Sequence, residues 1–494
     1  MNEKAEKIIA YALTIALLLL FSILAITSTA IFEGADNIAH YHVSHFAFKH
    51  PELFLYHWGK PLFNILSSPF AQAGFTGIKL FNVITGIATA YFAYRYLRSQ
   101  KVEMSLAVMP FVVFVPMYFM MMQSGLTEVL CSFIFIASAF CFVDKRYILS
   151  AIIMSFVPLS RTEAVIVLPI YGVAYLWFRQ YKAIPFLLTG SILFSIIGWF
   201  QYNDIFWMIT QNPYKGAADL YGNGELFHFI KEMPYAYGWP LIVLTIAGTL
   251  VTLFWLLRRK ARLAEPATAD FLVLFLPTIV ILAAHSYVWW KGLGNSAGLT
   301  RVLTVVMPLA SIIGFKGLNE LTRYIPYKWL KWALVLIALF FIVRVPFKRF
   351  PQPAKLHTAD LLMSQAADWI KSQNLQDRSI YYYDPEVAFF NHIDPWSHEK
   401  GRQIIRDGFI NENLFEEGSL IIWDAHFGAH EGRTPLSDLM NKQKIKLIKI
   451  LLPDPPFTVF GKDNYCIYIF MKDKKNSPHD NYTIEKEMLS AIPE

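Results

Sequence analysis

Long apolar runs recur between residues 8 and 346 of this chain, and they limit its fold more than any motif does. Each approaches the roughly 20 helical residues that cross the hydrocarbon core of a bilayer. A backbone in lipid must satisfy its own hydrogen bonds, so the runs are expected to be helices. Charged residues make up 16% of the chain and hydrophobic residues 55%, whereas soluble domains carry roughly 25% charge. The sequence therefore predicts an α-helical polytopic membrane protein.

The apolar pattern predicts about 11 membrane spans. The first run is longer than the roughly 7–15 residues of a signal-peptide core, so we interpret it as an uncleaved span. Several of the others are short or contain proline, which membrane helices tolerate. The spans are placed at 8–30, 76–97, 104–121, 126–143, 147–160, 163–178, 183–201, 237–257, 270–290, 299–318 and 330–346.

Basic residues indicate the orientation of these spans. They follow every even-numbered span and are scarce in the alternate connections, and cytoplasmic loops carry such an excess. The N-terminus is therefore predicted to be cytoplasmic and the tail after Val345 to lie outside. No basic run is interleaved with aromatic residues as nucleic-acid binding requires, so nucleic acid is not an expected partner. Without retention signals, a bacterial inner (plasma) membrane is the preferred location.

The tail differs in kind from the rest of the chain. Residues 360–373 have the spacing of an amphipathic helix, and four short segments alternate as strands do, at 379–383, 419–423, 446–452 and 465–471. We therefore divide the chain into a transmembrane module, 1–350, and a small extracytoplasmic α/β domain, 351–494. Asn481-Tyr482-Thr483 fits an N-glycosylation acceptor.

Polar residues gather in the first outer loop, 31–61. Asp36 follows the first span directly, so it is expected at the membrane surface, where a base for a lipid-linked substrate is needed. His57 and Lys60 come about twenty residues later, near the return to the membrane. A lysine is a point-charge donor suited to phosphate. This loop is therefore the first candidate site.

Five motifs share the predicted outer side. They are Gly34-Ala35-Asp36, His57-Trp58-Gly59-Lys60-Pro61-Leu62, Gly125-Leu126-Thr127-Glu128, Ser160-Arg161-Thr162-Glu163 and Gly298-Leu299-Thr300-Arg301. In this order they resemble the polytopic GT-C glycosyltransferases that use polyprenyl-phosphate sugars, which include protein mannosyltransferases and the lipid A aminoarabinose transferase. The layout of many spans, an elaborated first outer loop and a C-terminal outer domain matches over the whole chain.

The resemblance implies an inverting transfer of a sugar from a polyprenyl-phosphate-linked donor to a hydroxyl of a glycan, lipid or protein acceptor, in contact with membrane lipid. Asp36 would take the proton of the attacking hydroxyl. Lys60 and Arg301 would hold the leaving phosphate, where charge grows in the transition state. His57 and Arg161 stand behind them as further phosphate-binding candidates.

Two more carboxylates complete the catalytic candidates. Glu128 and Glu163 would orient the acceptor, hold a metal ion or fix Arg161. Relatives carry Asp-Glu where this chain has Asp36-Asn37, and one aspartate by itself is a poor cation cage. Whether a divalent metal is a cofactor thus stays open, and no organic cofactor is expected. In the tail, a separate set of candidate metal ligands is Asp424, His426, His430 and Glu431.

Other functions remain as alternatives at this stage. A lipid-linked sugar flippase or transporter usually has ionisable groups at the bilayer midplane, whereas here they gather at the outer ends of spans. An oligosaccharide ligase or polymerase would need a large arginine-bearing outer loop. The loop Gln201–Tyr237 has no arginine, and its aromatic residues fit either an acceptor-binding flap or an interfacial belt.

Overall fold

The chain forms two compact units. One comprises Met1–Ser28 and Val43–Ala354, and the other comprises Thr29–His42 and Lys355–Glu494. This computed structural model describes residues 3–32, 34–214, 221–258, 264–294, 296–404, 412–460 and 463–473. The predicted glycosylation acceptor at Asn481 lies outside the described residues. The tail thus forms a unit with part of the first outer loop, which the sequence had placed with the transmembrane module.

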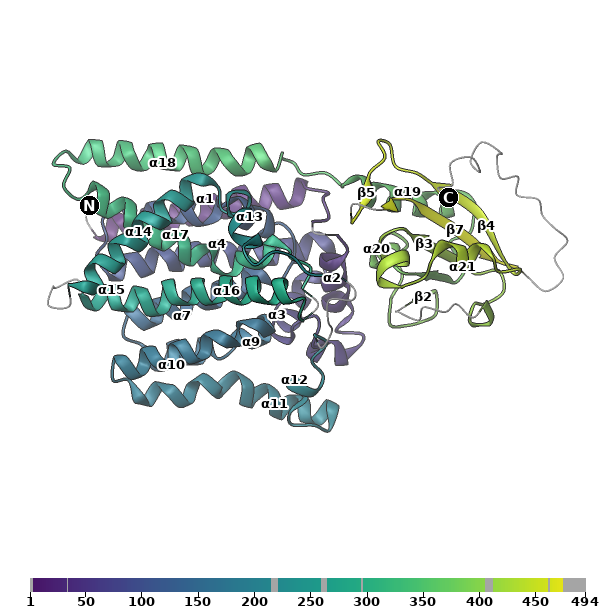
Figure 1. Cartoon of the computed structure of the whole chain (residues 1–494), viewed down its shortest axis with the longest axis horizontal. Coiled ribbons are helices and arrows are strands. Elements are labelled where there is room, and N and C mark those ends of the chain that lie inside the picture. The colour runs from purple at the N-terminus through teal and green to yellow at the C-terminus, as the bar shows by residue number, and fades with distance from the viewer. Residues whose placement is uncertain are drawn as a thin grey trace. The chain divides into compact units, whose positions relative to one another are not determined.

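The first unit is a helical bundle (Figure 1). Within the described ranges, seven segments are long and apolar enough to cross a membrane. They are α1 (Glu3–Thr27), α4 (Phe75–Ser99), α11 (Thr189–Tyr202) with the 3₁₀ turn before it, α14 (Trp239–Leu257), α15 (Ala264–Asp270) continuing into α16 (Leu276–Lys291), α17 (Met307–Thr322) with its preceding turn, and α18 (Lys328–Arg349).

Shorter elements account for the remaining predicted spans. They are α5 (Val108–Val113), α6 (Pro116–Met121), α7 (Glu128–Val143), α8 (Tyr147–Met154), α9 (Val157–Ser160) and α10 (Leu168–Trp177). The chain breaks between α5 and α6 because Pro116 lacks an N–H and restricts the residue before it. The prediction of a polytopic membrane protein is confirmed, and several spans are assembled from short helices.

Burial separates inner helices from outer ones. The apolar stretch that ends with α17 is 83% buried inside the protein, whereas those of α14 and α18 are each 17% buried and leave most of their surface for lipid. Backbones of α14 and α17 approach closely, since a Cβ at Gly248 would lie 1.9 Å from the carbonyl oxygen of Ile313. Small residues permit such contacts between membrane helices. Glu128 opens α7, and Arg301 lies in the turn that precedes α17. Both elements are largely buried, and so are these two candidate residues.

The second unit contains a five-stranded sheet in the order β2-β1-β3-β7-β4. The strands are β1 (Ile380–Tyr382), β2 (Gly401–Gln403), β3 (Leu420–Asp424), β4 (Ile445–Leu451) and β7 (Ile467–Lys472), with a separate hairpin of β5 (Thr458–Val459) and β6 (Asp463–Asn464). β1 runs parallel to β2 and β3, whereas β7 runs antiparallel to β3 and β4. The predicted α/β domain is confirmed.

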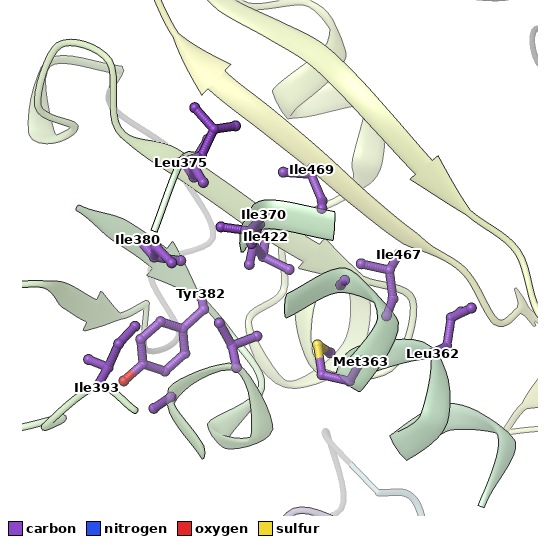
Figure 2. Close-up of a cluster of buried hydrophobic side chains, with 14 of the residues drawn as sticks. Leu362, Met363, Ile370, Leu375, Ile380, Tyr382, Ile393, Ile422, Ile467 and Ile469 are labelled. Carbon is purple, nitrogen blue, oxygen red and sulfur yellow. The ribbon is translucent and has the colours of Figure 1, made fainter. Parts of the chain in front are cut away.

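Helix α19 (Thr358–Ser372) covers one side of this sheet. Its buried residues Leu362, Met363, Ala366 and Ile370 recur every three or four positions, which places them on one face. That face meets β-strand residues such as Ile422 and Ile469 (Figure 2). The periodicity read from the sequence therefore corresponds to a real core. Helices α20 (Pro385–Phe390) and α21 (Leu436–Met440) complete the unit.

Candidate functional site

A strained turn presents Lys60. Its backbone has φ of 67°, a left-handed conformation uncommon for a residue with a side chain. Pro61 opens α3 (Pro61–Ala71) directly afterwards. Gly59 is needed before it because a Cβ there would lie 2.5 Å from the amide oxygen of Asn64. The amide nitrogen of Asn64 in turn donates to the carbonyls of Leu53 and Tyr56, 2.9 and 3.1 Å away. The turn is therefore held in one shape by its own sequence.

The amine of Lys60 is buried, with 4% of the residue exposed. It donates to the hydroxyls of Thr162 and Tyr214, at 3.4 and 2.6 Å, and lies 4.1 Å from the centre of the Tyr214 ring. The pKa of Lys60 is lowered to about 7, mainly by burial; Arg161 also lowers it, whereas Glu163 and Glu128 raise it. Within the described residues its hydrogen-bond partners are hydroxyl groups, so an incoming anion would gain a charge-assisted contact.

Arg161 joins the two candidate glutamates. Its guanidinium donates to Glu128 at 2.6 Å and to Glu163 at 2.6 Å, and it lies 3.4 Å from the hydroxyl of Thr127. The chain is extended at Arg161, between α9 and the 3₁₀ turn Thr162–Val167, which directs the side chain toward the start of α7. Glu128 is 1% exposed, so its charge needs such a partner. In this structure the two carboxylates fix Arg161.

Arg301 belongs to the same group of charges. Its Nε lies 3.6 Å from the carboxylate of Glu128, and the residue is 8% exposed. The backbone before it is held by His228, whose Nε2 donates to the carbonyl of Gly298 at 2.8 Å. When Lys60 is charged, it provides with Arg161 and Arg301 three cations against two glutamates, so the group then carries one net positive charge. A phosphodiester carries one negative charge.

His57 is adjacent to this group but faces a different partner. Its Nε2 donates to the carbonyl of Met208 at 2.9 Å, and its ring meets Trp207 edge-on at 6.0 Å. Both partners belong to α12 (Trp207–Thr210), in the loop between α11 and α14. Burial, and then the charge of Lys60, lowers the pKa of His57, which favours a neutral imidazole. His57 therefore anchors the outer loop onto the bundle.

Asp36 belongs to the other compact unit. It opens α2 (Asp36–Phe46) and is half-buried. A carboxylate in the first turn of a helix also complements the helix dipole. The structure therefore brings together Lys60, Glu128, Arg161, Glu163 and Arg301, with His57 beside them, and describes Asp36 as part of the second unit.

The candidate metal ligands of the tail have other roles. A carboxylate oxygen of Asp424 accepts the backbone N–H groups of His426 and Phe427, at 2.9 and 2.6 Å. Across the ranges that the structure describes, no three His, Cys, Asp or Glu side chains are grouped so as to hold a metal ion. Asp424 thus stabilises the turn that follows β3.

Three side chains near the cluster were not among the site residues predicted from the sequence. Thr162 and Tyr214 contact Lys60 directly, and His285 on α16 lies 3.9 Å from Glu163. Thr162 stands inside the Ser-Arg-Thr-Glu motif. His285 is an ionisable residue in an apolar run, a signal that marks functional positions in membrane helices. Tyr214 was seen only as one of several loop aromatics.

An apolar groove lies on the surface of the first unit. It has a volume of about 540 Å³ and is lined by Pro51, Phe54, Leu55, Ile65, Ile197, Phe200 and Gln201. These residues come from the first outer loop, α3 and α11. Leu55 is two residues before His57, so the groove and the charged cluster share one loop. None of the charged candidates lines the groove itself.

Comparisons with known proteins identify the fold. No protein-family model matches the chain, and no curated protein matches its sequence. Among solved structures, ArnT from Cupriavidus metallidurans bound to undecaprenyl phosphate has a TM-score of 0.56 at 10% identity, over 93% of this chain and 97% of that one. The arabinofuranosyltransferase AftD from Mycobacteria has a TM-score of 0.50 at 9% identity, over 94% of this chain and 40% of that one. The GT-C-like fold predicted from the sequence is confirmed.

Proposed function

We propose that this protein is an inverting glycosyltransferase that moves a sugar from a polyprenyl-phosphate donor to an acceptor hydroxyl on the outer face of the membrane. The observation that carries the proposal is the buried amine of Lys60, which has hydroxyl partners and whose charged form gives its cluster one net positive charge. A buried cation without a carboxylate contact is unfavourable. A phosphodiester would supply the missing counter-charge.

The transfer divides into roles for residues of this chain. The acceptor oxygen forms a bond to C1 of the sugar, the bond from C1 to the phosphate oxygen breaks, and its electron pair stays on the phosphate. Lys60 and Arg301 stabilise that charge as it grows. Asp36 takes the proton of the attacking hydroxyl. Arg161 pairs with Glu128 and Glu163 and so fixes the positions of its own guanidinium and of both carboxylates.

The likeness to ArnT and to the arabinofuranosyltransferase AftD supports this reading through the fold. ArnT of Cupriavidus metallidurans was solved with undecaprenyl phosphate, a polyprenyl phosphate. A long isoprenoid chain is apolar, and the groove lined by Leu55, Ile197 and Phe200 matches that property. We place the lipid chain of the donor in this groove, with its phosphate toward Lys60. The outer-face orientation follows from the distribution of basic residues between spans.

The test is sugar transfer from a radiolabelled polyprenyl-phosphate hexose by purified protein in lipid nanodiscs. Wild type should turn over, Asp36→Asn should lose about 10²- to 10⁴-fold in kcat, and the exposed carboxylate variant Asp377→Asn should match wild type. A parallel arm with a chelator determines whether a divalent metal is required. The anomeric configuration of the product, read by NMR, should be opposite to that of the donor.

Two results would contradict the proposal. Retention of configuration would exclude a single inverting displacement. If wild type and Asp36→Asn both bind the lipid-linked sugar equally but neither transfers it to glycan, lipid or protein acceptors, the base assignment fails and a lipid-linked sugar flippase becomes the better reading. Translocation of the same donor across vesicle membranes would then be measured directly.

A further inference from the structure

The segment Thr29–His42 belongs to the same compact unit as the C-terminal domain. It contains Asp36 and the first part of α2. Two aromatic residues of this segment, Tyr41 and His42, follow Asp36 by five and six positions on the same helix. An α-helix rises about 1.5 Å per residue, so Tyr41 lies about 7.5 Å along the axis from Asp36. A contact that holds Tyr41 therefore also holds Asp36.

Phe389 of the C-terminal domain makes that contact. Its ring meets Tyr41 edge-on, with centroids 5.8 Å apart and planes at 88°, and lies 6.3 Å from the ring of His42. Edge-to-face aromatic pairs contribute about 0.5–1.5 kcal/mol beyond the area that they bury. Phe389 lies near the end of α20, which begins where Asp384 accepts the N–H of Glu386 at 2.8 Å. The ring is thus fixed by a capped helix.

A second group of side chains lies in the turn after β3. His426 is held there by the Asp424 carboxylate and by the rings of Phe427 and Phe460, at 4.5 and 5.2 Å. Burial, followed by His430, lowers the pKa of His426 to about 4, while the carboxylate of Asp36 acts in the opposite direction.

These two groups share one edge of the sheet. β1 and β3 are adjacent parallel strands, with Ile380 opposite Leu420 and Tyr382 opposite Ile422. α20 follows the carboxyl end of β1 (Figure 1). The turn with His426 follows the carboxyl end of β3. In open α/β sheets, ligands bind at the carboxyl ends of the strands. In this chain that edge faces the protein's own Thr29–His42 segment.

We propose that the C-terminal domain is a positioning element of the transferase: through Phe389 it holds the Thr29–His42 segment, and with it the carboxylate of Asp36, in the geometry needed to deprotonate the acceptor. The inference rests on the proposed function, in which Asp36 is the base. A misplacement of about 1 Å can reduce a rate about 10²-fold. The domain therefore acts on the proton-transfer step and leaves donor binding, which depends on the first unit, unaffected.

The first experiment compares Phe389→Ala with Phe457→Ala. Phe457 stacks on Tyr465 at 4.9 Å and packs against the core of the same domain, so it controls for general loss of an aromatic contact. Phe389→Ala should lower kcat about 10- to 100-fold with the KM for donor unchanged, and Phe389→Tyr should restore it to within about threefold. Phe457→Ala should retain the kcat of wild type. Equal losses in the two alanine variants, or a loss confined to KM, would overturn the proposal.

A double-mutant cycle tests whether the contact itself is responsible. If Phe389 acts through Tyr41, the double variant Tyr41→Ala/Phe389→Ala should be no slower than the slower single variant. Fully additive losses would show that the two residues act independently, which contradicts the proposal.

Hydrogen exchange separates this inference from the proposed function. Amides of residues 36–42 should exchange faster in Phe389→Ala than in wild type or Phe457→Ala, whether or not any sugar is transferred. If wild type is inactive and this difference is still seen, the proposed function fails and the holding contact stands. If wild type is active and exchange at 36–42 is unchanged in Phe389→Ala, the domain does not hold the segment.

Discussion

The titration of Lys60 provides a sharp test of the phosphate site. Because its pKa is about 7, about half of the free protein carries a charged Lys60 at pH 7, roughly a tenth at pH 8 and roughly a hundredth at pH 9. Only the charged amine offers the counter-charge for phosphate. The kcat/KM for donor should therefore fall about 50-fold between pH 7 and pH 9.

The pH dependence of kcat should differ from that of kcat/KM. kcat/KM reports groups of the free enzyme, whereas kcat reports groups of the complex. A bound phosphate stabilises the ammonium of Lys60 and raises its pKa, so the decline of kcat should begin at a higher pH. Both profiles can be measured with the labelled donor in nanodiscs, after confirming by size-exclusion chromatography that the protein stays folded across the range.

Three variants make the assignment specific. Lys60→Arg stays charged throughout, so its kcat/KM should be lower than wild type at pH 7 but should lack the decline. Lys60→Met should be low at every pH. Lys231→Arg changes an exposed lysine of the loop Gln201–Tyr237 and should keep the wild-type pH profile of kcat/KM. A wild-type decline that persists in Lys60→Arg, or a flat wild-type profile from pH 7 to pH 9, would refute the reasoning.

Three further predictions follow from other parts of the structure. Arg161→Met leaves the carboxylate of Glu128, which is 1% exposed, without its closest cation. The variant should therefore be less stable than wild type by about 3–5 kcal/mol, measured as a lower unfolding temperature in detergent. An unchanged unfolding temperature would contradict the role of the ion pair. Ile197→Trp should fill the apolar groove and raise KM for a long-chain donor but not for a short-chain one, and equal effects on both would remove the lipid from the groove. Burial raises the pKa of Asp360 and of Asp424 to about 6 from 3.8, so the stability that these groups contribute is present below pH 4 and lost as pH rises through 6. Hydrogen-exchange protection of the β3 amides, corrected for intrinsic exchange rates, should therefore fall as pH rises from 4 to above 6. Protection that increases with pH would contradict the predicted direction.

The folded units were predictable from local pattern to different degrees. Apolar runs and alternating strands are determined by burial in lipid or in a core, so spans such as 76–97 and strands such as 465–471 were predicted within a few residues. β2 was missed because three residues of mixed polarity, Gly401–Gln403, carry no periodic signal. The broken span at 104–121 was predicted as one helix, although Pro116 was visible. A proline can kink a membrane helix or interrupt it, and packing selects between the two outcomes.

The candidate site shows the same division residue by residue. Glu128, Arg161 and Arg301 were recognisable because they are ionisable residues at the outer ends of apolar spans, where such residues often mark function. Their pairing was not, since Arg161 reaches Glu128 across 33 positions in sequence. Tyr214 and His285 join the cluster from distant segments. A single tyrosine among many aromatics has no distinguishing pattern, whereas His285 carries a signal as an ionisable residue in an apolar run. The assignment of Asp36 as the base remains a prediction for the transfer assay.

The sequence by itself determined the membrane class, the two-part division and the residue types of the site, because hydrophobicity and charge act locally along the chain. Only the tertiary structure decided which charges meet and where the first outer loop belongs. That loop was expected to serve the transmembrane module, yet Thr29–His42 forms a unit with residues 355–494, through the contact of Tyr41 with Phe389. Such a contact joins residues more than three hundred positions apart, and it depends on the shapes of two packed surfaces, which no local pattern encodes.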